Sequence, residues 1–131
     1  MNAINAALRS HLLRLAVLST LSVIIGLGIV FAGSGAAQKA FGTMTAGWAV
    51  VNLVIVVVSL RNKQLPDLRA FREFLMLNVG LNFGYIGVGL ALCLPSGASA
   101  VLVGNGAAVA IQGLILQVLD LYLLRQLPTT H

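Results

Sequence analysis

Apolar residues in this chain fall into four long runs, separated by short connections that are polar or rich in glycine. The runs cover about residues 15–31, 43–60, 74–94 and 99–124. Hydrophobic stretches of about 18 residues or more are typical of membrane-spanning helices. The pattern therefore predicts an all-α membrane protein whose single domain, residues 1–131, is an antiparallel bundle of four transmembrane helices.

The first 14 residues are expected to form a cytosolic amphipathic lead-in to the first span. Ile4, Leu8 and Leu12 recur at helical spacing, with polar residues between them. A lead-in of this kind lies along the lipid headgroups. His11 has no second histidine or cysteine at its depth, so we expect no metal site there.

The connections between the spans differ in character. Residues 32–42 are rich in glycine, alanine and serine, which predicts a flexible loop. Residues 61–73 hold six of the eleven charged side chains, and Pro66 suits the first turn of the third helix. Arg69 and Glu73 are four residues apart there, so they should form an ion pair.

Polar side chains inside the apolar runs predict a seam between helices. The turn at residues 94–97 is short, so spans three and four should be antiparallel neighbours. With a rise of about 1.5 Å per residue, the polar residues of spans two, three and four then reach comparable depths. We expect a hydrogen-bonded layer in the inner leaflet formed by Asn52, Asn78, Asn82, Gln117 and Asp120, with Tyr85 and Gln112 above it.

Small side chains form a second pattern, on span four and on span three. In span three they lie on the helix face nearly opposite the stripe shared by Asn78, Asn82 and Tyr85. Small residues let membrane helices approach closely. The predicted helix-packing face consists of Gly80, Gly84, Gly87, Gly106, Ala110 and Gly113. For the three glycines of span three, the sequence leaves open whether the partner surface belongs to the same chain or to another.

Charge sets the expected topology. Only 8% of the residues are charged, against about 25% in soluble domains. Seven of the eight lysines and arginines flank the ends of spans on the side of the termini, and only Lys39 lies on the other side. The bias predicts that both termini are cytosolic, in a bacterial inner (plasma) membrane. The net charge of +5 forms no separate basic patch, so the bilayer and not nucleic acid is the expected partner.

Motifs for catalysis are missing from the sequence. It contains no Ser/His/Asp set, no carboxylate pair within a span, no CxxC and no phosphate-binding glycine loop. We therefore expect neither an enzyme nor a bound cofactor or metal.

Two short motifs carry a resemblance to a known group of proteins. Residues 47–52, GWAVVN, and 78–85, NVGLNFGY, match the patterns W-x-x-x-N and N-x-G-L-x-x-G-Y. They resemble an uncharacterised family of small four-span bacterial inner-membrane proteins, over spans two to four. The resemblance implies the fold and brings no activity. Dual-topology fluoride channels and small multidrug transporters have a similar size, but their characteristic residues are absent.

Two functions are consistent with these features. The first is a structural or interaction module that forms a homo-oligomer or serves as an accessory subunit of a larger membrane complex. The alternative is a small channel or transporter for an ion or small polar solute, with the Asn/Gln/Asp seam as its path. We rank the first ahead, because amide side chains in a bilayer commonly bond helices to one another.

Overall fold

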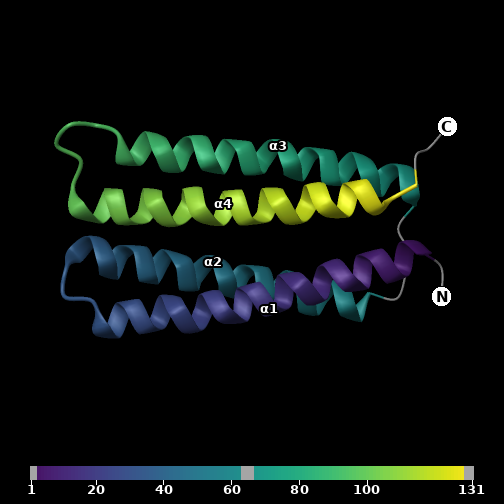
Figure 1. Ribbon diagram of the computed structural model, residues 1–131, viewed down its shortest axis with the longest axis horizontal. Coiled ribbons are helices and arrows are strands. Elements are labelled where there is room, and N and C mark those ends of the chain that lie inside the picture. The colour runs from purple at the N-terminus through teal and green to yellow at the C-terminus, as the bar shows by residue number, and fades with distance from the viewer. Residues whose placement is uncertain (1–2, 63–66, 129–131) are drawn as a thin grey trace.

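The computed structural model describes residues 3–62 and 67–128 and folds them into four helices (Figure 1). The helices are α1 (Ala3–Ala32), α2 (Ala36–Arg61), α3 (Leu68–Cys93) and α4 (Ala100–Gln126). Helices of 26 to 30 residues are roughly 39–45 Å long, more than the ~30 Å of a bilayer core. All four are also apolar enough to cross a membrane. The predicted all-α bundle of four antiparallel helices is confirmed.

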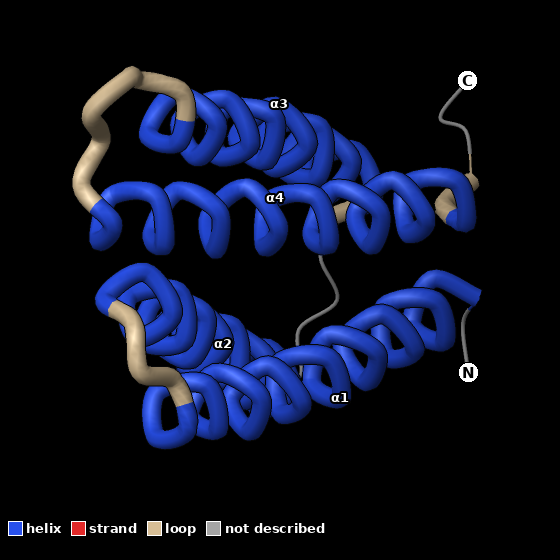
Figure 2. The backbone as a smooth tube through the Cα atoms, turned by 60° about the vertical axis from the view of Figure 1, so that its left-hand side comes forward, coloured by secondary structure: helices blue, strands red, loops and turns tan. Residues whose placement is uncertain are grey.

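The bundle consists of two helical hairpins, α1–α2 and α3–α4 (Figures 1 and 2). Helix α4 packs against α3, against α2 and, less extensively, against α1. Among the described residues, α3 makes no close backbone contact with α1 or α2. The start of α1 and the end of α4 lie at the same end of the bundle (Figure 1). We refer to this half as the terminal half, and to the half with the two hairpin turns as the loop half.

Glycines bring the helices of each hairpin together in the loop half. A Cβ atom on Gly26 of α1 would lie 2.7 Å from the carbonyl oxygen of Gly42 in α2. A Cβ on Gly89 of α3 would lie 2.6 Å from the carbonyl oxygen of Gly106 in α4. Backbone therefore packs directly on backbone at both places, which only glycine allows.

Helix α2 begins at Ala36, and only three residues separate it from α1. The prediction of a flexible loop over residues 32–42 is therefore wrong for most of that range. The Gln38 side chain accepts hydrogen bonds of 3.2 Å from the backbone amides of Ser34 and Gly35. This capping, together with several alanines, favours helix where composition alone indicated a loop.

Helix α3 begins directly after Asp67, whose carboxylate accepts a 3.1 Å hydrogen bond from the backbone amide of Ala70. Asp67 is thus the N-cap. The predicted helix start at Pro66 lies outside the described residues. The predicted ion pair between Arg69 and Glu73 is confirmed, with 3.2 Å between Nε and Oε1.

Helix α1 runs without a break through the lead-in and the first span. Leu12 and Leu15 form a buried cluster with Val56 of α2 and Leu119 of α4. The apolar stripe of residues 3–14 therefore contacts protein within the bundle, because the first part of α1 packs along α2 and α4.

The exterior of the bundle is apolar, and its interior buries polar side chains beside the apolar clusters. Large apolar side chains such as Phe31, Met76 and Leu94 are exposed on the outside of the bundle. Polar side chains are instead buried between the helices: His11, Ser19, Thr45, Asn52, Asn82, Gln112, Gln117 and Asp120. An apolar exterior around a polar interior is consistent with a protein that sits in a lipid bilayer.

Candidate functional site

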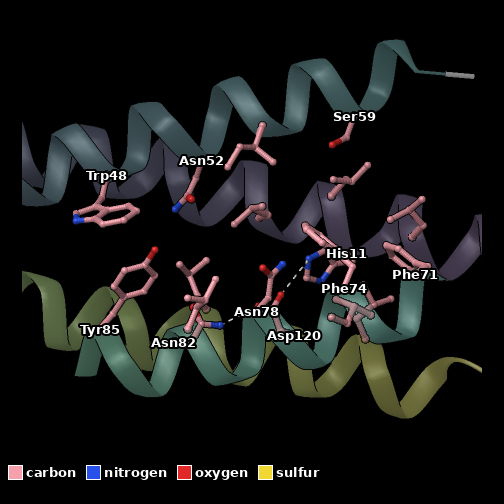
Figure 3. Close-up of a pocket in the computed structure, with 18 residues that line it drawn as sticks. His11, Trp48, Asn52, Ser59, Phe71, Phe74, Asn78, Asn82, Tyr85 and Asp120 are labelled. Atoms are coloured by element: carbon pink, nitrogen blue, oxygen red, sulfur yellow. Dashed lines mark hydrogen bonds and ion pairs between the residues drawn. The ribbon is translucent and has the colours of Figure 1, made fainter. Parts of the chain in front are cut away.

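A cavity of about 260 Å³ lies between the two hairpins in the terminal half (Figure 3). Residues of all four helices line it. Most of the lining is leucine, isoleucine and phenylalanine. Its polar and amphipathic members are His11, Trp48, Asn52, Ser59, Asn78, Asn82, Tyr85 and Asp120. We refer to this space as the polar cavity. An apolar wall with a few placed polar groups is typical of small-molecule sites.

Asp120 of α4 is the centre of the polar groups. Its Oδ2 accepts a 2.8 Å hydrogen bond from Nδ2 of Asn82 in α3. Its Oδ1 lies 3.7 Å from Nε2 of His11 in α1. The three residues are each less than 10% exposed. Three helices therefore converge on one buried carboxylate (Figure 3).

The packing of α3 on α4 explains why Asn82 reaches Asp120. Gly113 lies seven residues before Asp120, so both face the same side of α4. A Cβ on Gly113 would lie 3.2 Å from the carbonyl oxygen of Asn82 and 3.1 Å from Cγ1 of Ile86. Because Gly113 has no side chain, α3 lies close enough to α4 for the Asn82 amide to bond the carboxylate.

The carboxylate of Asp120 keeps unused acceptor capacity. Two carboxylate oxygens offer about four acceptor positions. The amide of Asn82 occupies one, and the 3.7 Å separation from His11 is longer than a hydrogen bond. A carboxylate in an apolar environment is costly unless it is paired and hydrogen-bonded. The carboxylate therefore keeps acceptor positions that no hydrogen bond from the described residues fills.

Two amides in the polar cavity have no protein partner. Asn52 of α2 is 6% exposed and Asn78 of α3 is half-buried, and both line the cavity. Within residues 3–62 and 67–128, no protein group hydrogen-bonds either amide. Each amide group provides two donors and an acceptor oxygen. Packing alone leaves them unsatisfied, so their hydrogen bonds are available to whatever occupies the cavity.

Aromatic side chains bound the polar cavity at both ends (Figure 3). The rings of Trp48 and Tyr85 pack edge to face with centroids 5.2 Å apart and planes at 61°. They connect α2 to α3 on the side of the loop half. Phe71 and Phe74 of α3 lie at the other end. Trp48 therefore packs inside the bundle, on Tyr85.

The structure brings most of the predicted seam together, but not all of it. Asn52, Asn78, Asn82, Tyr85 and Asp120 all line the polar cavity. Gln112 and Gln117 are also buried, yet they are not among the lining residues. Neither polar side-chain atom of Gln117 has a hydrogen-bond partner.

The predicted helix-packing face also divides. Gly106, Ala110 and Gly113 of α4 lie against α3, where the predicted close approach occurs. The three predicted glycines of α3 are exposed, and an added Cβ would meet no atom within 4 Å: Gly80, Gly84 and Gly87. Their face therefore points away from the rest of the chain.

Sequence reasoning missed His11 as a member of the site. The sequence did contain a signal for it, because Leu15 and Ser19 follow at intervals of four and continue the same helix face. All three side chains are buried. Taking residues 1–14 as a separate lead-in placed His11 outside the bundle. Across the described parts of the chain, no three histidine, cysteine or acidic side chains lie close enough to hold a metal ion.

Comparison with known proteins gives a family and no function. The sequence profile of a family of unknown function matches residues 14–121. The matched range includes all lining residues of the polar cavity except Leu8, His11, Leu12 and Leu123. No curated protein and no solved structure matches the chain.

Proposed function

The chain belongs to the family of unknown function DUF6992, and from its polar cavity we propose that it is a small membrane carrier that binds a solute with polar and apolar parts. The observation that carries the proposal is the cavity itself. It combines a buried carboxylate with spare acceptor capacity and two amides that no protein group satisfies. A seam that served only to join helices would bond these groups to one another.

Position in the bundle favours a carrier over an open channel. The polar cavity lies mainly in the terminal half and extends to Trp48 and Tyr85 near the middle of the bundle. In the loop half, Gly104 of α4 packs directly on the Ala37 backbone of α2, so the two hairpins are in close contact there. A site closed toward one side is the arrangement that a carrier needs. We propose binding without catalysis, because the described lining of the cavity pairs His11 with Asp120 and offers no serine or cysteine beside them that could act as an activated nucleophile.

Thiol accessibility tests the proposal. Cys93 is the chain's only cysteine, so Cys93→Ala gives a background without thiols. In that background, Asn78→Cys places a thiol in the polar cavity and Val88→Cys places one on the exposed apolar surface of the loop half. The thiolate is the reactive form, and it needs water to ionise. We expect a small water-soluble maleimide to label Asn78→Cys at least about ten times faster than Val88→Cys. Equal rates would indicate a dry seam and contradict the proposal.

A second candidate function, self-association, has its own observation. Gly80, Gly84 and Gly87 form an exposed strip that contacts nothing within the chain. Exposed glycines weaken a helix, and small residues at this spacing commonly form interfaces between membrane helices. We propose that a second copy of the chain packs on this strip. The mass of the solubilised particle tests it: Gly84→Leu should convert a dimer to a monomer, whereas a wild-type monomer would exclude the interface.

We also propose that both termini are cytosolic. The arginines at the terminal half are Arg9, Arg14, Arg61, Arg69, Arg72 and Arg125, while Lys39 lies at the loop half. The positive-inside rule then orients the bundle with its polar cavity in the inner leaflet. A fluorescent protein fused to the C-terminus should fluoresce in bacterial cells, and a C-terminal alkaline phosphatase should be inactive. The reverse pair of results would invert the topology.

A further inference from the structure

The charges that line the polar cavity restrict its ligand. Among the residues that the structure describes, Asp120 is the only acidic residue of the lining, His11 is the only histidine, and the lining contains no lysine or arginine. Arg14 and Arg72 are not among the lining residues and contact other groups. The guanidinium of Arg14 lies 4.5 Å from the ring centre of Tyr122, and Arg72 donates to the carbonyl oxygens of the C-terminal segment. No fixed positive charge therefore awaits an anion in the cavity.

The carboxylate of Asp120 favours a cation. Its two protein neighbours are an amide and an imidazole, and neither carries a fixed positive charge. Buried charges within a membrane are normally paired with an opposite charge. A positively charged ligand in the cavity would supply the partner that the protein does not.

The remaining lining favours an organic cation over a metal ion. Calcium or magnesium takes about six or more oxygen ligands, and the cavity offers one carboxylate. The aromatic rings of Trp48, Phe71, Phe74 and Tyr85 instead bound it at both ends. Aromatic faces attract ammonium groups through their quadrupoles. At about 260 Å³, the cavity lies just below the usual range for drug-sized ligands, so the ligand is small.

We propose that the polar cavity binds a small organic ammonium ion. In this arrangement Asp120 faces the positive charge, the aromatic rings surround its alkyl groups, and the amides of Asn52 and Asn78 bond a polar substituent. The inference rests on the proposed function, because it names the ligand class of the same site.

The single tryptophan provides the measurement. Trp48 is the chain's only tryptophan and lines the cavity, so a change in intrinsic fluorescence reports occupancy of this site. The probes are three molecules of nearly identical shape and different charge. They are choline, the neutral 3,3-dimethylbutan-1-ol, and the anionic 3,3-dimethylbutanoate. Titrations use the purified full chain in detergent micelles at about 0.15 M salt, where charges at the surface are screened beyond about 8 Å.

We expect saturable binding of choline, at least about ten-fold tighter than that of the neutral alcohol, with no binding of the anion. Asp120→Asn should reduce the preference for choline over the alcohol to about two-fold or less. Glu73→Gln, which removes an exposed carboxylate outside the cavity, should leave the preference unchanged.

The outcomes separate the inference from the proposed function. If the alcohol or the anion binds saturably and choline does not bind more tightly, the cavity is a ligand site and the assignment of an ammonium ion is wrong. If no probe changes the fluorescence saturably while the maleimide labels Asn78→Cys slowly, both proposals are wrong. The comparison of the three probes on the wild-type chain decides the question even if Asp120→Asn fails to fold.

Discussion

The two halves of the bundle use opposite means to position their helices. In the loop half, glycines bring backbones into direct contact, as at Gly26 with Gly42 and Gly89 with Gly106. In the terminal half, α2 and α3 are separated by the polar cavity, and side chains bridge the space. Close backbone packing therefore holds the loop half together. In the terminal half, several polar side chains face a cavity instead of one another.

The largest loss of stability should follow from a methyl group added in the loop half. A Cβ at Gly104 of α4 would overlap the backbone carbonyl of Ala37 in α2, where the two hairpins meet. Because neither backbone can move alone, Gly104→Ala should lower the free energy of unfolding by about 3 kcal/mol. Gly28→Ala is the matched control, since its added methyl meets no atom within 4 Å and Gly28 lies outside the proposed interface between copies. Unfolding in mixed detergent micelles measures both, and equal losses would contradict the packing role.

A somewhat smaller loss should follow when the carboxylate in the terminal half loses its hydrogen bond. Asn82→Leu removes the 2.8 Å bond to Asp120 and leaves the buried carboxylate facing His11 at 3.7 Å, beyond hydrogen-bond distance. A hydrogen bond to a charged group contributes about 1.5–3 kcal/mol, so we expect a loss of about 2 kcal/mol in the same unfolding measurement. An unchanged stability would show that the bond does not hold α3 to α4.

The same substitution one turn earlier should have little effect on stability. Asn78→Leu removes an amide that has no protein partner, so the free energy of unfolding should change by less than about 1 kcal/mol. The fluorescence response of Trp48 to choline should nevertheless weaken, because the amide faces the cavity. A loss as large as that of Asn82→Leu would assign Asn78 to the structure of the bundle.

The smallest effect is expected at the surface of the terminal half. Arg69 and Glu73 form an ion pair whose side chains are 81% and 67% exposed. Water and salt screen such a pair, so Arg69→Ala should lower the stability by less than about 0.5 kcal/mol. A loss above about 1 kcal/mol would mean that Arg69 makes a contact beyond this pair.

The comparison of the two halves also shows what the sequence could predict. The four apolar runs predicted the four helices, because length and hydropathy are properties of each segment alone. Helical periodicity placed Asn78, Asn82 and Tyr85 on one face, and the short turn correctly made α3 and α4 neighbours. Depth along the spans then predicted that Asn82 and Asp120 belong to one layer, where they are hydrogen-bonded.

What the sequence could not predict depends on how the hairpins pack. The polar cavity exists because the backbones of α3 and α2 lie apart, and no pattern within one helix determines that separation. His11 joins the site because α1 extends along α4, beyond the span that hydropathy defines. Periodicity grouped Gln117 with Asp120, but the orientation of α4 against α3 leaves Gln117 outside the cavity. Whether Gly84 faces its own chain or the outside depended on the same packing.

The central claim is that water and solutes, not lipid, reach the polar cavity, and fluorescence quenching of Trp48 tests it most directly. The natural chain needs no substitution, because its only tryptophan lines the cavity. In reconstituted bilayers, we predict strong quenching of Trp48 by water-soluble acrylamide and weak quenching by lipids that carry bromine on their acyl chains. Strong quenching by the brominated lipids, with protection from acrylamide, would contradict the account.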